Sequence, residues 1–232
     1  MLIARALLKT IFAFLFCVVA ASAQTATVPT VTFSFDFPQS DPEHYVITVA
    51  SDGHASYDSD GKLIFYSEAS GVSTKLDFTM SENTRKRIFD LATRAHYFEK
   101  DVDTKIKNLA DMGKKTLAYK DGEKSTQAVY NYSQIPAVLE LTQLFQNLSS
   151  TLEYGRRLQH DYRHQKLALD DELRNMEESA KRNELEELTA VAPLLRQIAN
   201  DSSVMNVSRN RALRLLHVVW LRENIFIKKN SD

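Results

Sequence analysis

The sequence has a single cysteine, Cys17, among its 232 residues. A disulfide framework or a cysteine-based zinc site needs several thiols, so neither can hold this chain together. Glycine is sparse too, with six copies, and only Gly155 lies between Gln134 and Asp232. This uneven distribution predicts a turn-rich first part and a helix-rich second part.

The chain also lacks an excess of charge of one sign, because its formal net charge is -1. A dedicated nucleic-acid binder normally carries a clear cationic excess, so that class is excluded. With 25% charged, 44% hydrophobic and 9% aromatic residues, the sequence is neither disordered nor that of an all-hydrophobic membrane protein. The composition indicates a folded chain of one or two domains.

No apolar run near the N-terminus is long enough to cross a bilayer. The run Ile11–Ala21 has 11 residues, about half of the roughly 20 that a spanning helix needs. Arg5 and Lys9 precede it, and Ala21-Ser22-Ala23 follows it as a cleavage motif. We predict that residues 1–23 are a signal peptide cleaved after Ala23; the alternative is an uncleaved anchor or a buried N-terminal helix.

Cleavage at this point would remove Cys17 and leave a cysteine-free mature chain without a transmembrane segment. The mature protein is then expected in the periplasm or outside the cell. Residues 24–30 are expected to be a flexible lead-in.

Residues 31–133 are predicted to form an α+β domain. Val31, Phe33 and Phe35 alternate with polar residues, which is typical of a half-buried strand. The dipeptides Asp52-Gly53 and Asp121-Gly122 predict hairpin turns. The expected strands are Val31–Phe37, Tyr45–Val49, His54–Tyr57, Lys62–Tyr66, Thr74–Thr79, Lys115–Tyr119 and Ser125–Tyr130, and a helix is expected from Ser81 to about Ala95. Short turns between the strands predict an antiparallel sheet with one packed helix.

Residues 134–232 are predicted to form a C-terminal helical region of three or four helices, a small bundle packed on the sheet. Their apolar residues recur at helical spacing in stripes that begin near Ile135, Leu158 and Leu185. Pro193 should kink a helix or start a new one. Asp201 or Ser202 is expected to cap the last helix.

Charges of opposite sign gather in two stretches of this region. Residues 168–187 hold eight acids against three bases, whereas residues 201–232 hold six bases against three acids. These stretches predict either two neighbouring helices of opposite sign or two separate solvated faces.

One pair of side chains has the spacing of a metal site. His160 and His164 are four residues apart, which places both imidazoles on one face of a helix within reach of one zinc ion. The pattern is similar to the His-Glu-x-x-His motif of zinc metallopeptidases, with Asp161 in place of the glutamate. Arg163 lies inside the motif and no third ligand is identifiable, so a solvated helix face is the competing interpretation.

Several turn and helix motifs resemble those of exported bacterial α+β domains to which no activity is assigned. The similarity covers about residues 43–133. It is carried by Asp52-Gly53-His54-Ala55-Ser56-Tyr57, Ser81, Ile88-Phe89-Asp90-Leu91, Tyr97-Phe98 and Thr116-Leu117-Ala118-Tyr119-Lys120-Asp121-Gly122. The resemblance implies a small α+β domain with no known activity, and it assigns no functional residues.

These observations lead us to expect an exported, non-enzymatic binding or structural module that contacts another protein in the cell envelope. We expect no catalytic residue, no cofactor and no nucleic-acid partner, and the oligomeric state is left open. One alternative is a metal-dependent hydrolase that uses His160 and His164. Another is a secreted inhibitor-like module that inserts a hairpin tip into a target enzyme.

The leader generates the first testable prediction. N-terminal sequencing of the exported protein should begin at Gln24, because the Ala-x-Ala motif directs cleavage after Ala23. Recovery of a mature form that still contains residues 12–23 would contradict it.

Overall fold

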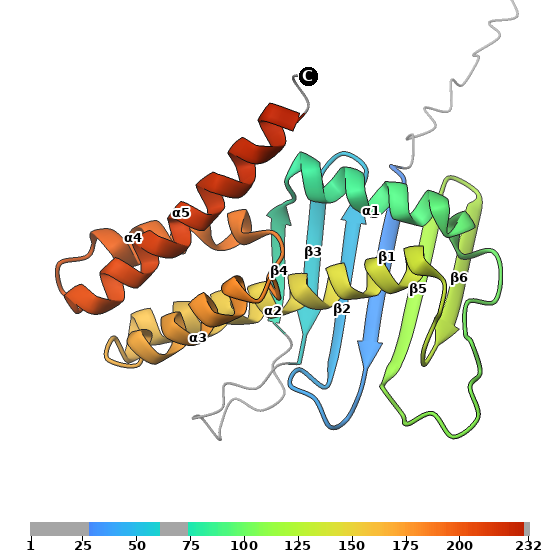
Figure 1. Cartoon of the computed structure of the whole chain (residues 1–232), viewed down its shortest axis with the longest axis horizontal. Coiled ribbons are helices and arrows are strands. Elements are labelled where there is room, and N and C mark those ends of the chain that lie inside the picture. The colour runs from blue at the N-terminus through green and yellow to red at the C-terminus, as the bar shows by residue number, and fades with distance from the viewer. Residues whose placement is uncertain (1–27, 61–73, 230–232) are drawn as a thin grey trace, which may run out of the picture.

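The structure is a computed structural model that describes residues 28–60 and 74–229 (Figure 1). Six strands and five α-helices confirm the predicted α+β class. The expected leader and the expected strand Lys62–Tyr66 lie outside the described residues. The predicted division of the chain at residue 133 stays a prediction.

The strands form one antiparallel sheet in the order β4-β3-β2-β1-β5-β6. Their bounds are β1 Thr30–Asp36, β2 His44–Ala50, β3 His54–Ser59, β4 Thr74–Thr79, β5 Lys114–Asp121 and β6 Lys124–Tyr130. Strand β1 buries Val31, Phe33 and Phe35 as its alternation predicts. It lies at the centre of the sheet, while β4 and β6 form the two edges.

Both predicted Asp-Gly turns connect neighbouring strands. Gly53 joins β2 to β3 and Gly122 joins β5 to β6, and both glycines have positive φ, at 101° and 56°. A residue with a Cβ atom rarely adopts such angles, so glycine is the residue that these turns need.

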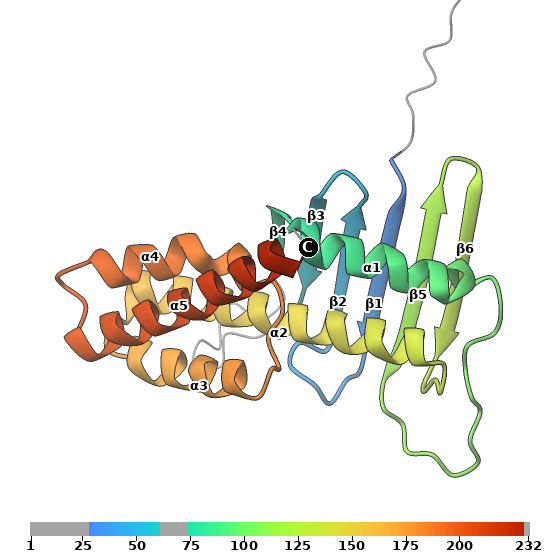
Figure 2. The same cartoon turned by 45° about the horizontal axis from the view of Figure 1, so that its top comes forward.

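Two helices cover the same face of the sheet (Figures 1 and 2). Helix α1, Glu82–Arg94, is capped by Ser81, whose Oγ accepts a hydrogen bond from the Thr84 N–H at 3.4 Å. Helix α2, Pro136–His164, joins α1 on this face, so one helix of the predicted C-terminal region packs on the sheet. Its Phe145 ring stacks on Phe33 with centroids 5.1 Å apart and planes at 2°.

Helix α2 continues past the sheet without a break. The stripe that begins near Leu158 was expected to form a helix of its own, but α2 extends to His164 and the break falls at Gln165 instead. A 29-residue helix is about 43 Å long. Its C-terminal half therefore projects beyond β4, where it packs with the remaining helices (Figure 1).

We call this assembly the helical part: the C-terminal half of α2 with α3, η2, α4 and α5. The bounds of the later elements are α3 Leu169–Lys181, η2 Leu188–Val191, α4 Ala192–Asn200 and α5 Asn206–Lys229. It has its own buried apolar cluster, which includes Leu158, Leu173 and Leu195. Among the described helices, none combines the length and the apolar character needed to span a membrane.

The start of α4 follows the sequence, but the start of α5 does not. Pro193 lies in the first turn of α4, so it begins a helix as predicted. Helix α5 begins at Asn206, too far along the chain for Asp201 or Ser202 to cap it. Asp201 instead accepts hydrogen bonds from the Lys166 ammonium at 2.7 Å and the Tyr162 hydroxyl at 2.9 Å. The Lys166 ammonium, with hydrogen bonds from Ser203, holds the pKa of Asp201 well below its ordinary value.

The two charged stretches lie against each other, which confirms the first of the two interpretations. Arg211 on α5 contacts Asp170 at 2.8 Å and Glu177 at 2.7 Å, both on α3. Arg214 also contacts Glu177, at 2.6 Å. Glu177 is nearly buried, so its two arginine partners compensate the loss of water.

The sheet core generates the second prediction. Phe145→Ala should lower the free energy of unfolding by about 3–5 kcal/mol, because it removes a fully buried ring and its stack on Phe33. Urea unfolding of both proteins measures the loss. Leu139→Ala on the same helix is the control: Leu139 is exposed, so its loss should cost less than about 1 kcal/mol. Equal losses for the two variants would contradict the packing described here.

Candidate functional site

Helix α2 leaves the sheet at Glu153, a carboxylate that is only 3% exposed. Its Oε1 accepts hydrogen bonds from the Tyr57 hydroxyl at 2.8 Å and the Ser59 hydroxyl at 2.7 Å, both on β3. Its Oε2 accepts from Arg156 Nη2 at 2.6 Å and Nε at 2.8 Å. Both carboxylate oxygens are thus paired, and α2 is fixed to β3 at this point.

The Tyr57 hydroxyl stays protonated and donates its hydrogen bond to Glu153. Burial raises the pKa of Tyr57 far above its ordinary value, and the negative charge of Glu153 raises it further. The hydroxyl also lies 3.0 Å from Ser149 Oγ on α2. The phenol therefore stays protonated and links β3 to two positions on α2.

A hollow lies on each side of α2 at this junction. The first, a polar cleft of about 300 Å³, opens toward α3 and the loop before β2. It is lined by hydroxyl and charged side chains, including Ser149, Ser150, Glu153, Tyr154, Arg157 and Ser179. The second, of about 260 Å³, opens toward β4. We call the second hollow the edge groove, and its walls include Lys75, Leu76, Leu152, Gly155, Val191 and Leu194.

The polar groups of the cleft bond mainly to one another. The Tyr154 hydroxyl lies 3.1 Å from Ser179 Oγ, which joins α2 to α3. Arg157 contacts Glu172 at 2.6 Å and lies over the Tyr154 ring at 4.8 Å. These contacts account for the polar lining as part of the packing between α2 and α3.

The edge groove differs because its exposed groups include an apolar side chain. Leu76 on β4 is 40% exposed, although its strand partner Tyr57 is buried. Lys75 has no ion-pair partner within residues 28–60 and 74–229. Opposite them, η2 and α4 contribute Val191 and Leu194. Among the described residues, the groove therefore combines an outer strand, which no other described strand pairs on that side, with an apolar wall, and Lys75 borders it.

Gly155 determines how closely the wall approaches α2. A Cβ atom at this position would lie 2.6 Å from Val191 Cγ1, well inside van der Waals contact. A glycine inside a helix usually costs stability relative to alanine. Its isolation in the helix-rich half was the one sequence signal for this close contact.

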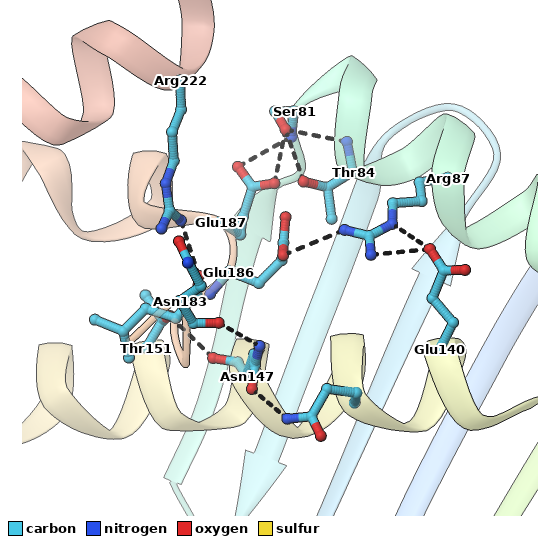
Figure 3. A network of polar contacts seen from close by, with 12 residues as sticks. Ser81, Thr84, Arg87, Glu140, Asn147, Thr151, Asn183, Glu186, Glu187 and Arg222 are labelled. Atoms are coloured by element: carbon cyan, nitrogen blue, oxygen red, sulfur yellow. Dashed lines mark hydrogen bonds and ion pairs between the residues drawn. The ribbon is translucent and has the colours of Figure 1, made fainter. Parts of the chain in front are cut away.

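A second polar network holds the helical part against α1 (Figure 3). Ser81, the cap of α1, donates from its hydroxyl to Glu187 at 2.7 Å and from its N–H at 3.2 Å. Thr189 also donates to Glu187. Glu187 is nearly buried, and burial raises its pKa above the ordinary value, against the opposing effect of the Ser81 hydrogen bonds.

The loop between α3 and η2 is hydrogen-bonded to α2 and to α5 (Figure 3). Asn147 Nδ2 donates to the Asn183 carbonyl at 3.1 Å, and the Glu186 N–H donates to Thr151 Oγ1 at 3.1 Å. Arg222 on α5 donates to the Leu185 carbonyl at 2.8 Å. This loop thus connects α2 and α5, and so fixes the wall of the edge groove.

The predicted metal ligands lie on the C-terminal half of α2, and neither is among the residues that line the two hollows. His160 and His164 share one face of α2, with ring centroids 4.8 Å apart. His160 Nδ1 lies 3.4 Å from Asp161 Oδ1. Within the described chain, no group of three or more His, Cys, Asp or Glu side chains is arranged to hold a metal ion. A metal site at this pair stays a prediction that rests on two ligands.

The two hairpin tips of the inhibitor alternative lie at the same end of the sheet. Strands β2 and β5 both run antiparallel to β1, so the turns at Gly53 and Gly122 follow parallel strands. Insertion of either tip into an enzyme stays a prediction.

Comparison with known protein families finds no match, and no curated protein matches the chain.

The buried Glu187 generates the third prediction. Its proton is held more tightly in the folded protein than in the unfolded chain, because burial raises the folded pKa. The resulting stabilisation is complete below the ordinary glutamate pKa of about 4.3 and is lost as pH rises through the folded pKa. Glu187→Gln cannot ionise, so the stability of the unaltered protein relative to this variant should fall as pH rises.

Urea unfolding at several pH values from about 4 to 7 measures this difference. Glu186→Gln is the matched control, because Glu186 lies in the same loop but faces Arg87 at 3.6 Å. A difference between the unaltered protein and Glu187→Gln that stays constant with pH would contradict the prediction.

Proposed function

We propose that the protein is exported and acts as a non-enzymatic binding module that contacts another protein of the cell envelope at the edge groove. The observation that carries the proposal is the outer edge of β4, which no other strand of the described chain pairs, beside an apolar wall from η2 and α4. Hollows between two packed parts of a protein are common binding sites. A groove between a strand edge and a helix is a recurrent site for peptide segments.

The size and lining of the groove suit a side chain from a protein partner. About 260 Å³ accommodates one or two apolar side chains, and Leu76, Leu152 and Leu194 surround them. Burial of apolar surface against these leucines would provide the main free energy of binding. The two polar networks hold both walls before a partner arrives, so little ordering is required on binding.

Peptide selection tests this proposal. Random 12-residue peptides displayed on phage are selected on the purified protein, and the affinities of selected peptides are measured by fluorescence anisotropy. Leu194→Arg should weaken binding at least tenfold, because it replaces an apolar side chain of the wall with a cation. Leu213→Arg is the matched control, since Leu213 is 51% exposed on α5 and lines neither hollow.

Thermal unfolding of both variants checks that each remains folded. Selected peptides that bind Leu194→Arg as tightly as the unaltered protein would overturn the assignment of the edge groove. The assignment would also be overturned if the selected peptides did not displace one another from the protein, because they would then bind at different sites.

A further inference from the structure

We infer that the edge groove binds an extended segment as an additional strand antiparallel to β4, and that it selects the order basic, apolar, acidic in that segment. This inference rests on the proposed function and specifies its ligand. Strand β4 ends the sheet, with no described strand on its outer side. Every second residue of such an edge directs its N–H and C=O outward, where a further strand can pair.

An antiparallel orientation agrees with the rest of the sheet. All five strand pairs are antiparallel, and antiparallel pairs are slightly more stable per residue than parallel ones. An antiparallel addition at β4 would continue this pattern.

The position of the helical part favours a single segment over a second copy of the chain. Figures 1 and 2 both show this part projecting past β4 on the side of the sheet that the helices cover. Two copies paired through β4 would share one continuous sheet, with both helix layers on the same side. The second copy would then need to place its own helices where the first copy's helical part lies. A lone strand brings no helix layer with it.

The side chains of β4 alternate between the two faces of the sheet. Leu76 pairs with Tyr57 and lies on the helix-covered face, beside the apolar wall. The alternation directs Lys75 and Asp77 toward the opposite face, and both are exposed; Lys75 also borders the groove and lies opposite Asp58 of β3 in the register. Neither has an ion-pair partner in the part of the chain that the structure describes.

This arrangement dictates the complementary segment. Its central residue lies opposite Leu76 and should be apolar, because it enters the groove. In an antiparallel segment, the preceding residue lies opposite Asp77 and the following residue lies opposite Lys75. Opposite charges stabilise such cross-strand pairs and like charges destabilise them. The favoured order is therefore lysine or arginine, then an apolar residue, then aspartate or glutamate.

Two labelled peptides of equal composition test the order. The first is Ser-Thr-Val-Lys-Leu-Asp-Val-Thr-Ser, and the second exchanges its lysine and aspartate. Fluorescence anisotropy should show about tenfold tighter binding of the first peptide, because the exchange turns two opposite-charge pairs into two like-charge pairs. The double variant Lys75→Asp/Asp77→Lys should reverse the preference without loss of affinity for its own preferred peptide.

A third peptide tests strand addition itself. The backbone nitrogens of the first peptide are methylated at alternate residues, either at the odd or at the even positions. One of these two patterns removes the N–H donors that face β4, and the other removes those that face away from it. One pattern should abolish binding and the other should leave it within about threefold. Equal effects of both patterns, or none, would overturn strand addition.

The outcomes separate this inference from the proposed function. If Leu194→Arg abolishes binding of selected peptides but charge order has no effect, the order fails while the binding site stands. If selected peptides ignore Leu194→Arg, the proposed site itself fails. Sedimentation of the protein without peptide gives one more test. If the protein is a dimer, if Lys75→Asp dissociates it and if Lys75→Asp/Asp77→Lys restores it, then β4 pairs with a second copy of the chain. That result would overturn the inference.

Discussion

Helix α2 must remain unbroken while it serves two hydrophobic cores, and the rest of the structure depends on that constraint. Its first half packs on the sheet through residues such as Leu141 and Phe145, whereas Leu158 belongs to the cluster of the helical part. Because a helix of this length is stiff, the second core can form only beyond the sheet, next to β4. The two hollows beside α2 are a direct result of this placement.

Two buried carboxylates hold the two parts against each other. A buried charge is costly unless hydrogen bonds and opposite charges replace its water. Glu153 meets this need with hydroxyls of β3 and with Arg156. At Glu187 the cap of α1 meets it only in part, because burial still raises the pKa of that carboxyl. Apolar packing alone has little directionality, whereas these bonds require specific positions of their partners. The walls of the edge groove are therefore set before any partner binds.

Local patterns were sufficient to predict much of the fold. The alternation in β1, the Asp-Gly turns and the cap at Ser81 each depend on a few neighbouring residues, and the structure contains all three. The helix boundaries were harder to predict. Helical spacing of apolar residues continues from Leu158 through Leu169, although the chain turns near Gln165. A turn between two helices that face the same core leaves the stripe intact, so the pattern cannot reveal it.

The edge groove could not be predicted from the sequence. Spacing alone singled out His160 and His164, because both lie on one helix face. The edge groove instead combines Leu76, Gly155 and Leu194 from segments far apart in the chain. By itself, the sequence determined the α+β class, the faces of the strands and the opposite charges of α3 and α5. Only the tertiary structure decided that β4 has an apolar wall beside it, because that depends on the length of α2 and on what its far end packs against.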